Sequence, residues 1–333
     1  MENKVEAIVK QFFKPENIES VKVFSTRAIV TLRDIAENAE VNALLEKALL
    51  ALPEIEKVSI IYTADKKVQK INAAANDKYN VRGVKKIIGV ASGKGGVGKS
   101  TTAVNLALAL QCLGLNVAVF DADIYGPSVP TMLGYEGAKP ISFDGKTFEA
   151  FDYKNVKSMS IGTLIDKSQP LIWRGAKACG AIEQLMTETN WGEIDVMVID
   201  MPPGTGDIQI TLSQKLDLDG VVIVSTPQDI ALIDAIKGVN MFKRVDVPIL
   251  GIIENMSYYL CEKCGHRADI FGHEGAKKTA EELGEIFLGE IPLHLSIRQN
   301  ADAGTPIVLA EPESPHTKAY LEIAEKIKAE LKI

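Results

Sequence analysis

The chain has 333 residues, and its 44 acidic and 37 basic side chains give a formal net charge of -7. This acidic balance argues against a general nucleic-acid binder, which normally carries a basic face. With 46% hydrophobic and 24% charged residues, the composition is typical of a globular protein with one large core and room for a smaller domain.

The N-terminal residues and the cysteine content both bear on the cellular compartment. Residues 1–10 alternate charged and apolar side chains without a continuous apolar run, so we expect no secretory signal. Four cysteines in a chain of this length are too few for a disulfide scaffold, which favours a thiol or metal role. We therefore expect a cytoplasmic protein that forms no stable association with membranes or nucleic acid.

Residues 1–80 are expected to form a small α+β domain. The alternation in 20–34 predicts two short strands, the three-and-four spacing in 39–55 predicts an amphipathic helix, and 56–64 returns to a strand pattern. A polar stretch follows, which we interpret as a linker or a solvated helix that contains the end of this domain. Its basic residues are Lys66, Lys67, Lys70, Lys78, Arg82, Lys85 and Lys86.

Residues 81–333 show short apolar runs that alternate with helical patterns. The runs are rich in Val and Ile, as expected of strands buried on both faces of a mostly parallel, doubly wound α/β sheet. The predicted strands are 87–92, 116–123, 196–203, 221–227 and 249–255, and the predicted helices are 99–113, 180–189 and 229–245. Polar residues follow the strands, and the carboxyl ends of such strands form the ligand crevice.

The segment Gly93–Thr101 reads GKGGVGKST and matches the phosphate-binding pattern G-x-x-x-x-G-K-[ST]. It lies between a predicted strand and a predicted helix, so its backbone N–H groups are placed to cradle phosphates. In this pattern Lys99 reaches the β- and γ-phosphates and Ser100 holds Mg²⁺. We assign nucleotide binding to Gly93, Lys94, Gly95, Gly96, Val97, Gly98, Lys99, Ser100 and Thr101.

Acidic residues follow two of the predicted strands. Asp200 ends an apolar run and is the candidate Walker-B ligand for Mg²⁺, whereas Asp121 and Asp123 end another run. One of these two is expected to orient the attacking water. For Asp121, capping of the strand end and a role in catalysis are equally good interpretations.

The pattern of Gly93–Thr101 resembles the deviant Walker A motif of the nitrogenase iron protein, MinD and ParA class of P-loop ATPases. In that class the early lysine, here Lys94, crosses a nucleotide-sandwich dimer and contacts the phosphates bound by the partner. The resemblance implies that Lys94, Lys99 and Asp123 are catalytic, that the nucleotide is ATP and that the protein is a homodimer whose closure promotes hydrolysis.

Longer motifs resemble the Mrp/ApbC family of iron–sulfur cluster carrier ATPases from about residue 82 to 307. They include DADIYGPSVPTMLG, IWRG, VIDMPPGTGDIQITL, TPQDIALIDAIKG and GIIENMSY. The resemblance implies that Asp123 is the switch aspartate that activates water and that Asn255 and Pro292 lie beside the adenine. The small N-terminal domain resembles iron–sulfur assembly domains more weakly, and it contains no cysteine.

Cys261 and Cys264 form a C-x₂-C pair that can hold one metal centre but supplies only half of a four-cysteine site. Cys112 is expected to be a buried apolar residue within a helix, and we favour packing for Cys179 as well. Two-fold symmetry in a dimer would complete the site. A zinc knuckle that includes His266 remains an alternative, and redox chemistry a weaker one. The family resemblance implies a bridging, labile [4Fe–4S] cluster that is passed to apo-proteins.

Three whole functions are consistent with these motifs. The leading one is a homodimeric, ATP-hydrolysing carrier or scaffold for iron–sulfur clusters. A MinD- or ParA-like positioning ATPase would use the same nucleotide site but has no need of the cysteine pair, and a nucleotide switch would hold structural zinc there. The C-terminal segment 314–333 predicts an amphipathic helix, and its acidic residues favour packing on the core over membrane binding.

Overall fold

The computed structural model describes residues 2–24, 27–33, 38–63, 78–164 and 175–333. Internal contacts divide the chain into two units, Met1–Ala75 and Asn76–Ile333, which are described separately. Most of the expected linker, and all but the last residue of the IWRG motif, lie outside the described residues.

The N-terminal unit packs two helices against a three-stranded sheet. Its elements are α1 (Glu2–Phe12), β1 (Ile18–Phe24), β2 (Arg27–Arg33), α2 (Ala39–Leu50) and β3 (Lys57–Thr63), with a 3₁₀ turn at Pro15–Asn17. β1 pairs antiparallel with β2, and β2 pairs parallel with β3. The predicted strands and helix are confirmed. The helix α1 was not predicted, although Val5 and Val9 show the spacing of a buried stripe and both are fully buried.

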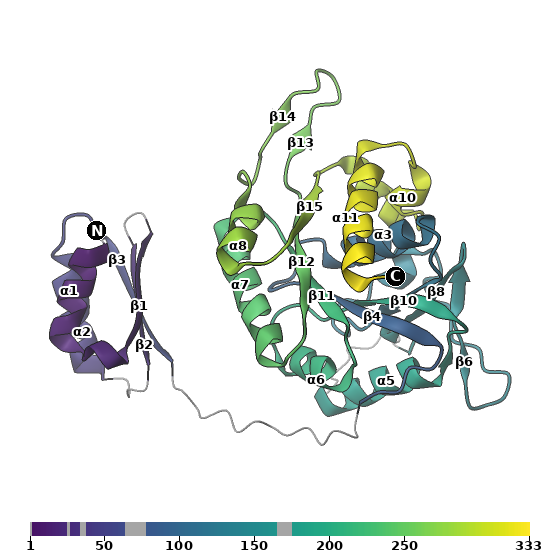
Figure 1. Ribbon diagram of the computed structural model, residues 1–333, viewed down its shortest axis with the longest axis horizontal. Helices are drawn as coiled ribbons and strands as arrows, with labels where there is room; N and C mark the ends of the chain where they lie inside the picture. The colour runs from purple at the N-terminus through teal and green to yellow at the C-terminus, as the bar shows by residue number, and fades with distance from the viewer. Residues whose placement is uncertain (1, 25–26, 34–37, 64–77, 165–174) are drawn as a thin grey trace. The chain divides into compact units, whose positions relative to one another are not determined.

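The second unit is built on an eight-stranded sheet (Figure 1). All neighbouring strands are parallel except the edge strand β7, which pairs antiparallel with β8. In spatial order the strands are β15 (Phe287–Ile291), β12 (Ile249–Asn255), β11 (Gly220–Ser225), β4 (Val84–Ala91), β10 (Ile194–Asp200), β5 (Val117–Asp121), β8 (Val156–Ser160) and β7 (Phe151–Tyr153).

Helices cover both faces of this sheet. Alternate residues of β4 show why: Ile87 belongs to one apolar cluster and Ile88 to the other. The first face is covered by α5 (Gly175–Glu188), α6 (Asp207–Lys215), α7 (Asp229–Arg244) and α8 (Gly275–Leu283). The second is covered by α3 (Lys99–Cys112), α4 (Val129–Met132), α9 (Leu295–Asp302), α10 (Ile307–Ala310) and α11 (Pro315–Leu331). The predicted doubly wound, mostly parallel α/β fold is confirmed.

The helix α3 lies between the sheet and α11, and every residue from Thr102 to Leu110 is buried. The predicted helix at 99–113 and the predicted strand at 116–123 are confirmed by α3 and β5. The C-terminal helix α11 packs on α3 and β15 through residues that include Tyr320, Ile323 and Ile327, as the sequence predicted. Each helix that the structure describes is too short or too polar to cross a bilayer.

The chain joins the second unit within the stretch that the sequence assigned to a solvated linker. The Tyr79 side chain is buried in the core of this unit, and its N–H donates to the carbonyl of Lys215 at 2.8 Å. Lys85 and Lys86 lie in β4 and pair with Asp195 at 2.8 Å and Asp219 at 2.7 Å. The linker interpretation is therefore wrong for Lys85 and Lys86, whose ammonium groups pair with acids at the amino ends of the strands.

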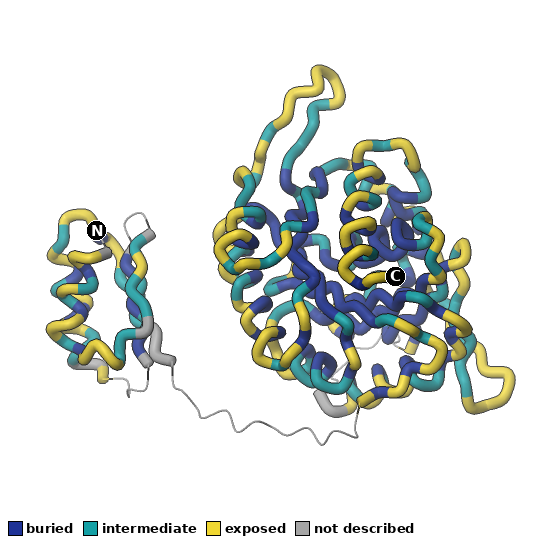
Figure 2. Tube along the Cα trace, viewed as in Figure 1, coloured by how far each residue is buried: buried dark blue, intermediate teal, exposed yellow. Residues whose placement is uncertain are grey.

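Three smaller elements lie outside the eight-stranded sheet. A 3₁₀ turn spans Ile161–Leu164, and β6 (Phe148–Glu149) pairs with β9 (Thr189–Asn190). The third is a hairpin of β13 (Tyr259–Leu260) and β14 (Arg267–Ala268), called the cysteine hairpin below. It projects from the body beyond the carboxyl end of β12 (Figure 1), and its tip is mostly exposed (Figure 2).

Candidate functional site

The phosphate-binding loop joins the carboxyl end of β4 to the first residue of α3, as the motif predicted. Gly96 and Gly98 adopt left-handed backbone angles, with φ of 83° and 82°, a region that side chains disfavour. Gly93 is required for another reason, because a Cβ there would lie 2.1 Å from the carbonyl oxygen of Asp234. The loop therefore combines tight turns with close approach of neighbouring backbone.

Gly93→Ala is expected to destabilise the protein by about 1–3 kcal/mol, because the backbone at Asp234 cannot yield as a flexible side chain would. Gly95→Ala is the matched control, since no atom lies within 4 Å of its added Cβ. Its effect on stability should stay within about 0.5 kcal/mol. Urea unfolding of the two variants measures the difference, and equal losses would contradict the close approach.

The Lys99 ammonium is buried between two carboxylates. Its Nζ lies 2.6 Å from Asp200 Oδ1 and 3.3 Å from both Asp123 Oδ2 and Ser100 Oγ. Burial alone lowers the pKa of Lys99, but the charges of Asp200 and Asp123 outweigh it and raise that pKa, so the lysine stays charged. The structure thus gathers these four residues, which the sequence assigned to one site.

Asp200 fits the expected role of a Mg²⁺ ligand. It is fully buried at the end of β10, and its Oδ2 atom has no hydrogen-bond partner among the described residues. Burial raises the pKa of Asp200, whereas the Lys99 charge and a hydrogen bond from the Ser100 hydroxyl lower it. A buried acceptor without a partner is costly, and a cation next to it would remove that cost.

Asp121 and Asp123 have different surroundings, although one residue separates them. Asp121 is fully buried and accepts hydrogen bonds from the N–H groups of Asp123, Ser128 and Val129 and from the Ser160 hydroxyl. Burial, with the charge of Asp200, raises the pKa of Asp121 to about 7. Its bonds fix the loop after β5, so the structure favours the capping interpretation.

Asp123 faces the phosphate-binding loop through its contact with Lys99. Its other oxygen, Oδ1, accepts a hydrogen bond from the N–H of Gly126 at 3.3 Å. This arrangement leaves the Asp123 carboxylate beside the lysine that the motif assigns to the β- and γ-phosphates. The side chain is therefore near the place where an attacking water would need to be oriented.

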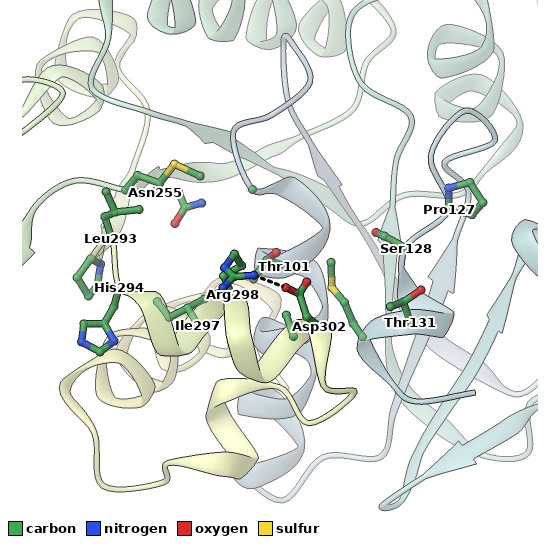
Figure 3. Close-up of a pocket in the computed structure, with 15 residues that line it drawn as sticks. Thr101, Pro127, Ser128, Thr131, Asn255, Leu293, His294, Ile297, Arg298 and Asp302 are labelled. Atoms are coloured by element: carbon green, nitrogen blue, oxygen red, sulfur yellow. Dashed lines mark hydrogen bonds and ion pairs between the residues drawn. The ribbon is translucent and has the colours of Figure 1, made fainter. Parts of the chain in front are cut away.

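A pocket of about 340 Å³ opens beside the phosphate-binding loop (Figure 3). Gly98 and Thr101 from the loop and α3 line it together with Asn255 and Pro292, the two residues that the resemblance placed beside adenine. Asn255 also braces the loop, because its Nδ2 donates to the carbonyl of Val97 at 2.7 Å. The pocket thus continues from the predicted phosphate site toward the ends of β12 and β15.

Other residues of this pocket were not predicted from the sequence. Pro127, Ser128 and Thr131 line one side, whereas His294 and Arg298 come from the chain after β15 (Figure 3). One available signal was position, since the first three follow the end of β5 and the other two follow the end of β15. Pro127, Ser128 and Thr131 also belong to the motif DADIYGPSVPTMLG, which was matched to the family without a role for these three residues, whereas His294 and Arg298 belong to no motif named from the sequence.

Lys94 is partly exposed, and its carbonyl accepts a hydrogen bond from Ser92 Oγ at 2.8 Å. Lys99 is paired with two carboxylates, whereas no described residue forms a salt bridge with the Lys94 ammonium. The two lysines of the loop therefore differ in burial and in ion pairing. Lys99 is held inside this chain, and Lys94 is available to a group outside it.

Cys261 and Cys264 lie in the turn of the cysteine hairpin. The N–H of Cys261 donates to the carbonyl of His266, and the N–H of Gly265 donates to the carbonyl of Cys261. Hydrogen bonds from the backbone N–H groups of Lys263 and Cys264 lower the pKa of the Cys261 thiol. Such donors stabilise a thiolate, which is the form that binds metal.

The hairpin by itself provides only two metal ligands. Across the described residues, no three side chains of His, Cys, Asp or Glu are grouped to hold a metal ion, and His266 is not grouped with the two cysteines. Cys179 is half-buried, in keeping with packing. The expectation that Cys112 is buried is wrong. The buried part of α3 ends at Leu110, and Cys112 follows it in the exposed last turn.

The Cys261 thiol of the metal-free protein is expected to be alkylated with a midpoint pH below that of Cys112. The backbone donors lower the pKa of Cys261, whereas partial burial raises that of Cys112, so the thiolate of Cys261 forms first as the pH rises. Iodoacetamide labelling with peptide-resolved mass spectrometry gives both midpoints in one sample. Coincident midpoints would contradict the stabilisation by the turn.

Comparison with known proteins agrees with this geometry. The family model ParA, described as NUBPL iron-transfer P-loop NTPase, matches residues 83–328. The iron-sulfur cluster carrier protein of Haemophilus influenzae is 45% identical, and the alignment covers 99% of this chain and 92% of that protein. The iron-sulfur cluster transfer protein NUBPL of Dictyostelium discoideum is 48% identical, with coverages of 77% and 80%. A nucleotide-binding protein from Archaeoglobus fulgidus, whose structure was solved with ADP, is 34% identical and superposes with a TM-score of 0.62. The match covers 71% of this chain and 92% of that protein.

Proposed function

Since the chain belongs to the ParA family of NUBPL-type iron-transfer P-loop NTPases, we propose that it is an ATP-hydrolysing carrier of iron–sulfur clusters. In this proposal the cargo is a [4Fe–4S] cluster, the carrier is a cytoplasmic homodimer and the acceptors are apo-proteins. The observation that carries the proposal is the pair of accessible cysteines on the projecting hairpin, in a chain that also contains the complete phosphate-binding loop.

The cysteine hairpin suits a cargo that must be released. Cys264 is exposed and Cys261 is partly exposed, so an acceptor's thiols can reach a cluster bound there. Two protomers related by a two-fold axis would supply four thiolates, the number that such a cluster needs. Each chain then gives up only two bonds when the cluster leaves, which favours transfer over permanent storage.

The nucleotide site supports ATP binding and hydrolysis through four side chains. When bound with the nucleotide, Mg²⁺ would neutralise phosphate charge, with Ser100 and Asp200 as its protein ligands. Lys99 would exchange its contacts with Asp200 and Asp123 for the phosphates. Asp123, relieved of that contact, would orient water and accept its proton.

Lys94 supports the homodimer because its ammonium group is available outside the chain. In the proposed dimer it contacts the phosphates bound by the partner and stabilises the charge that develops during hydrolysis. Hydrolysis per protomer should then rise with protein concentration until the dimer saturates. Lys94→Ala should lose most of this activity and its concentration dependence, as measured by phosphate release across a dilution series.

Anaerobic reconstitution tests the proposed cargo. The purified protein would be incubated with iron and sulfide, and its visible spectrum, iron content and mass recorded. We expect a brown dimer with about four iron atoms per pair of chains, which restores the activity of an apo-protein that requires such a cluster. Zinc in place of iron, or a colourless monomer with intact hydrolysis, would overturn the carrier proposal.

A further inference from the structure

The nucleotide pocket and the cysteine hairpin share two segments of chain. Met256 lies in the pocket wall, and three residues later the chain enters the hairpin at Tyr259. The second segment leaves β15 beside it: the N–H of Ser257 donates to the Ile291 carbonyl at 3.0 Å, and the N–H of Leu293 donates to the Tyr258 carbonyl at 2.7 Å. The wall of the pocket is therefore continuous with the base of the hairpin.

Arg267 of β14 strengthens the base of the hairpin. Its guanidinium lies 4.0 Å from the centre of the Tyr258 ring, and it forms ion pairs with Asp269 and, at 3.2 Å, with Glu290 of β15. These contacts join β14 to Tyr258, the residue before β13, and to β15, from which the second segment leaves. The base of the hairpin is thus tied to the part of the chain that leads into the pocket wall.

One side-chain contact also joins the pocket to the turn that carries the cysteines. His294 lines the pocket, and its Nε2 lies 3.2 Å from Oε1 of Glu262, the residue between Cys261 and Lys263. The His294 side chain is 17% exposed, whereas that of Glu262 is 66% exposed. His294 is thus largely buried in the pocket wall, whereas Glu262 lies in the exposed turn between the two cysteines.

The orientation of the His294 ring is set by its own neighbours. Its Nδ1 accepts a hydrogen bond from the N–H of Ser296 and caps the N-terminus of α9, so the ring hydrogen of the neutral form is on Nε2. The ring also stacks on His316, with centroids 4.2 Å apart. Nε2 is therefore the ring atom that faces Glu262 Oε1, at 3.2 Å, and it carries a hydrogen in this tautomer.

We propose that His294 and Glu262 form the link through which nucleotide in the pocket sets the conformation of the Cys261–Cys264 turn. A base or ribose that packs against His294 restrains the ring and so restrains the Glu262 contact. This inference rests on the proposed function, because the turn is a cluster site only if the protein carries a cluster. The link itself involves only side chains of one chain and operates without a cluster.

Linkage makes this proposal measurable from the cysteine side. If nucleotide restrains the turn, the reactivity of its thiols must depend on nucleotide, and couplings of this kind usually change an equilibrium by about fivefold or more. In the full-length, metal-free, reduced protein, saturating Mg·ADP is expected to slow the alkylation of Cys264 by N-ethylmaleimide about fivefold. Cys112, exposed in α3, serves as the internal control and should react at the same rate with and without nucleotide.

Variants of Glu262 separate the link from other causes. Glu262→Ala removes the acceptor and should abolish the effect of Mg·ADP on Cys264, whereas Glu262→Gln keeps an acceptor oxygen and should retain it. Lys263→Gln is the matched control for a charge change in the same turn and should also retain it. His294→Asn preserves a helix-capping acceptor but cannot reach Glu262, so it should behave as Glu262→Ala does at saturating nucleotide.

Three outcomes would overturn the link. The first is a wild-type alkylation rate of Cys264 that does not change with Mg·ADP, and the second is a Glu262→Ala variant that slows with Mg·ADP as the wild type does. The third is a Glu262→Gln variant whose rate, like that of Glu262→Ala, does not respond to Mg·ADP. The second would be expected if nucleotide acts only by bringing two chains together over the hairpin. Iron retention, measured separately, tests the cargo. If the protein bound no iron but the variants changed Cys264 alkylation as expected, the carrier proposal would be overturned and the link supported. If the protein bound iron but the variants did not change the effect of Mg·ADP on Cys264, only the link would be overturned.

Discussion

Asp123→Asn is expected to lower the rate of ATP hydrolysis by about a hundredfold or more, with little change in nucleotide affinity. The amide has nearly the same shape as the carboxylate and can still accept from the Gly126 N–H, so the loop after β5 should keep its conformation. It cannot accept a proton from water, which is the role proposed for Asp123. Phosphate release and ADP binding, measured on the same preparation, separate the two effects.

Asp121→Asn provides the control for this prediction because it makes the same change two residues away. Asp121 accepts four hydrogen bonds, and an amide group at this place would turn N–H hydrogens toward some of these donors. We expect a loss of stability of about 1–3 kcal/mol, measured by urea unfolding. If Asp121→Asn folded normally and lost hydrolysis while Asp123→Asn retained it, the assignment of the two roles would be reversed.

Cys264→Ser is expected to abolish the retention of a reconstituted cluster. Each protomer contributes two thiolates to the proposed site, so one substitution removes two of the four ligands from the dimer. The variant should lose the visible absorption and nearly all bound iron after gel filtration, while the fold and nucleotide binding are unchanged, because the hairpin tip lies outside the core. Iron analysis and thermal unfolding measure the two properties.

Cys112→Ser is the matched control for the cysteine prediction. Cys112 is exposed, as Cys264 is, but it lies at the end of α3. Its replacement should leave the iron content at the wild-type level. If Cys112→Ser also released the iron, or if Cys264→Ser retained it, the cluster would not be held by the hairpin pair.

The phosphate-binding loop and the five predicted strands could be identified from the sequence because their signals are local. Lys99 follows Gly98 directly in the chain, and the predicted strand, the glycine-rich loop and the predicted helix are consecutive segments. Their order can therefore be read without knowledge of the fold. A strand buried on both faces requires a run of apolar residues, and that requirement is met within one segment. The same reasoning located Asp200 at the end of such a run.

Elements with a weak pattern of their own were missed. The strand β8, Val156–Ser160, contains Lys157 and two serines and does not read as an apolar run, yet its pairing with β5 places it in the sheet. The helix α8 and the strand β15 were likewise not predicted. The position of these segments depends on pairing and packing with elements distant in the chain, which the pattern of their own residues does not reveal.

The sequence by itself determined the fold class, the phosphate-binding loop and the spacing of the cysteine pair, because each depends on residues close together in the chain. Only the tertiary structure decided that Asp121 is a buried acceptor while Asp123 faces Lys99, since one residue of separation carries no information on what surrounds each carboxylate. It also decided that His294 meets Glu262. That contact joins two loops that follow different strands, and it exists because a parallel sheet brings the carboxyl ends of β12 and β15 together.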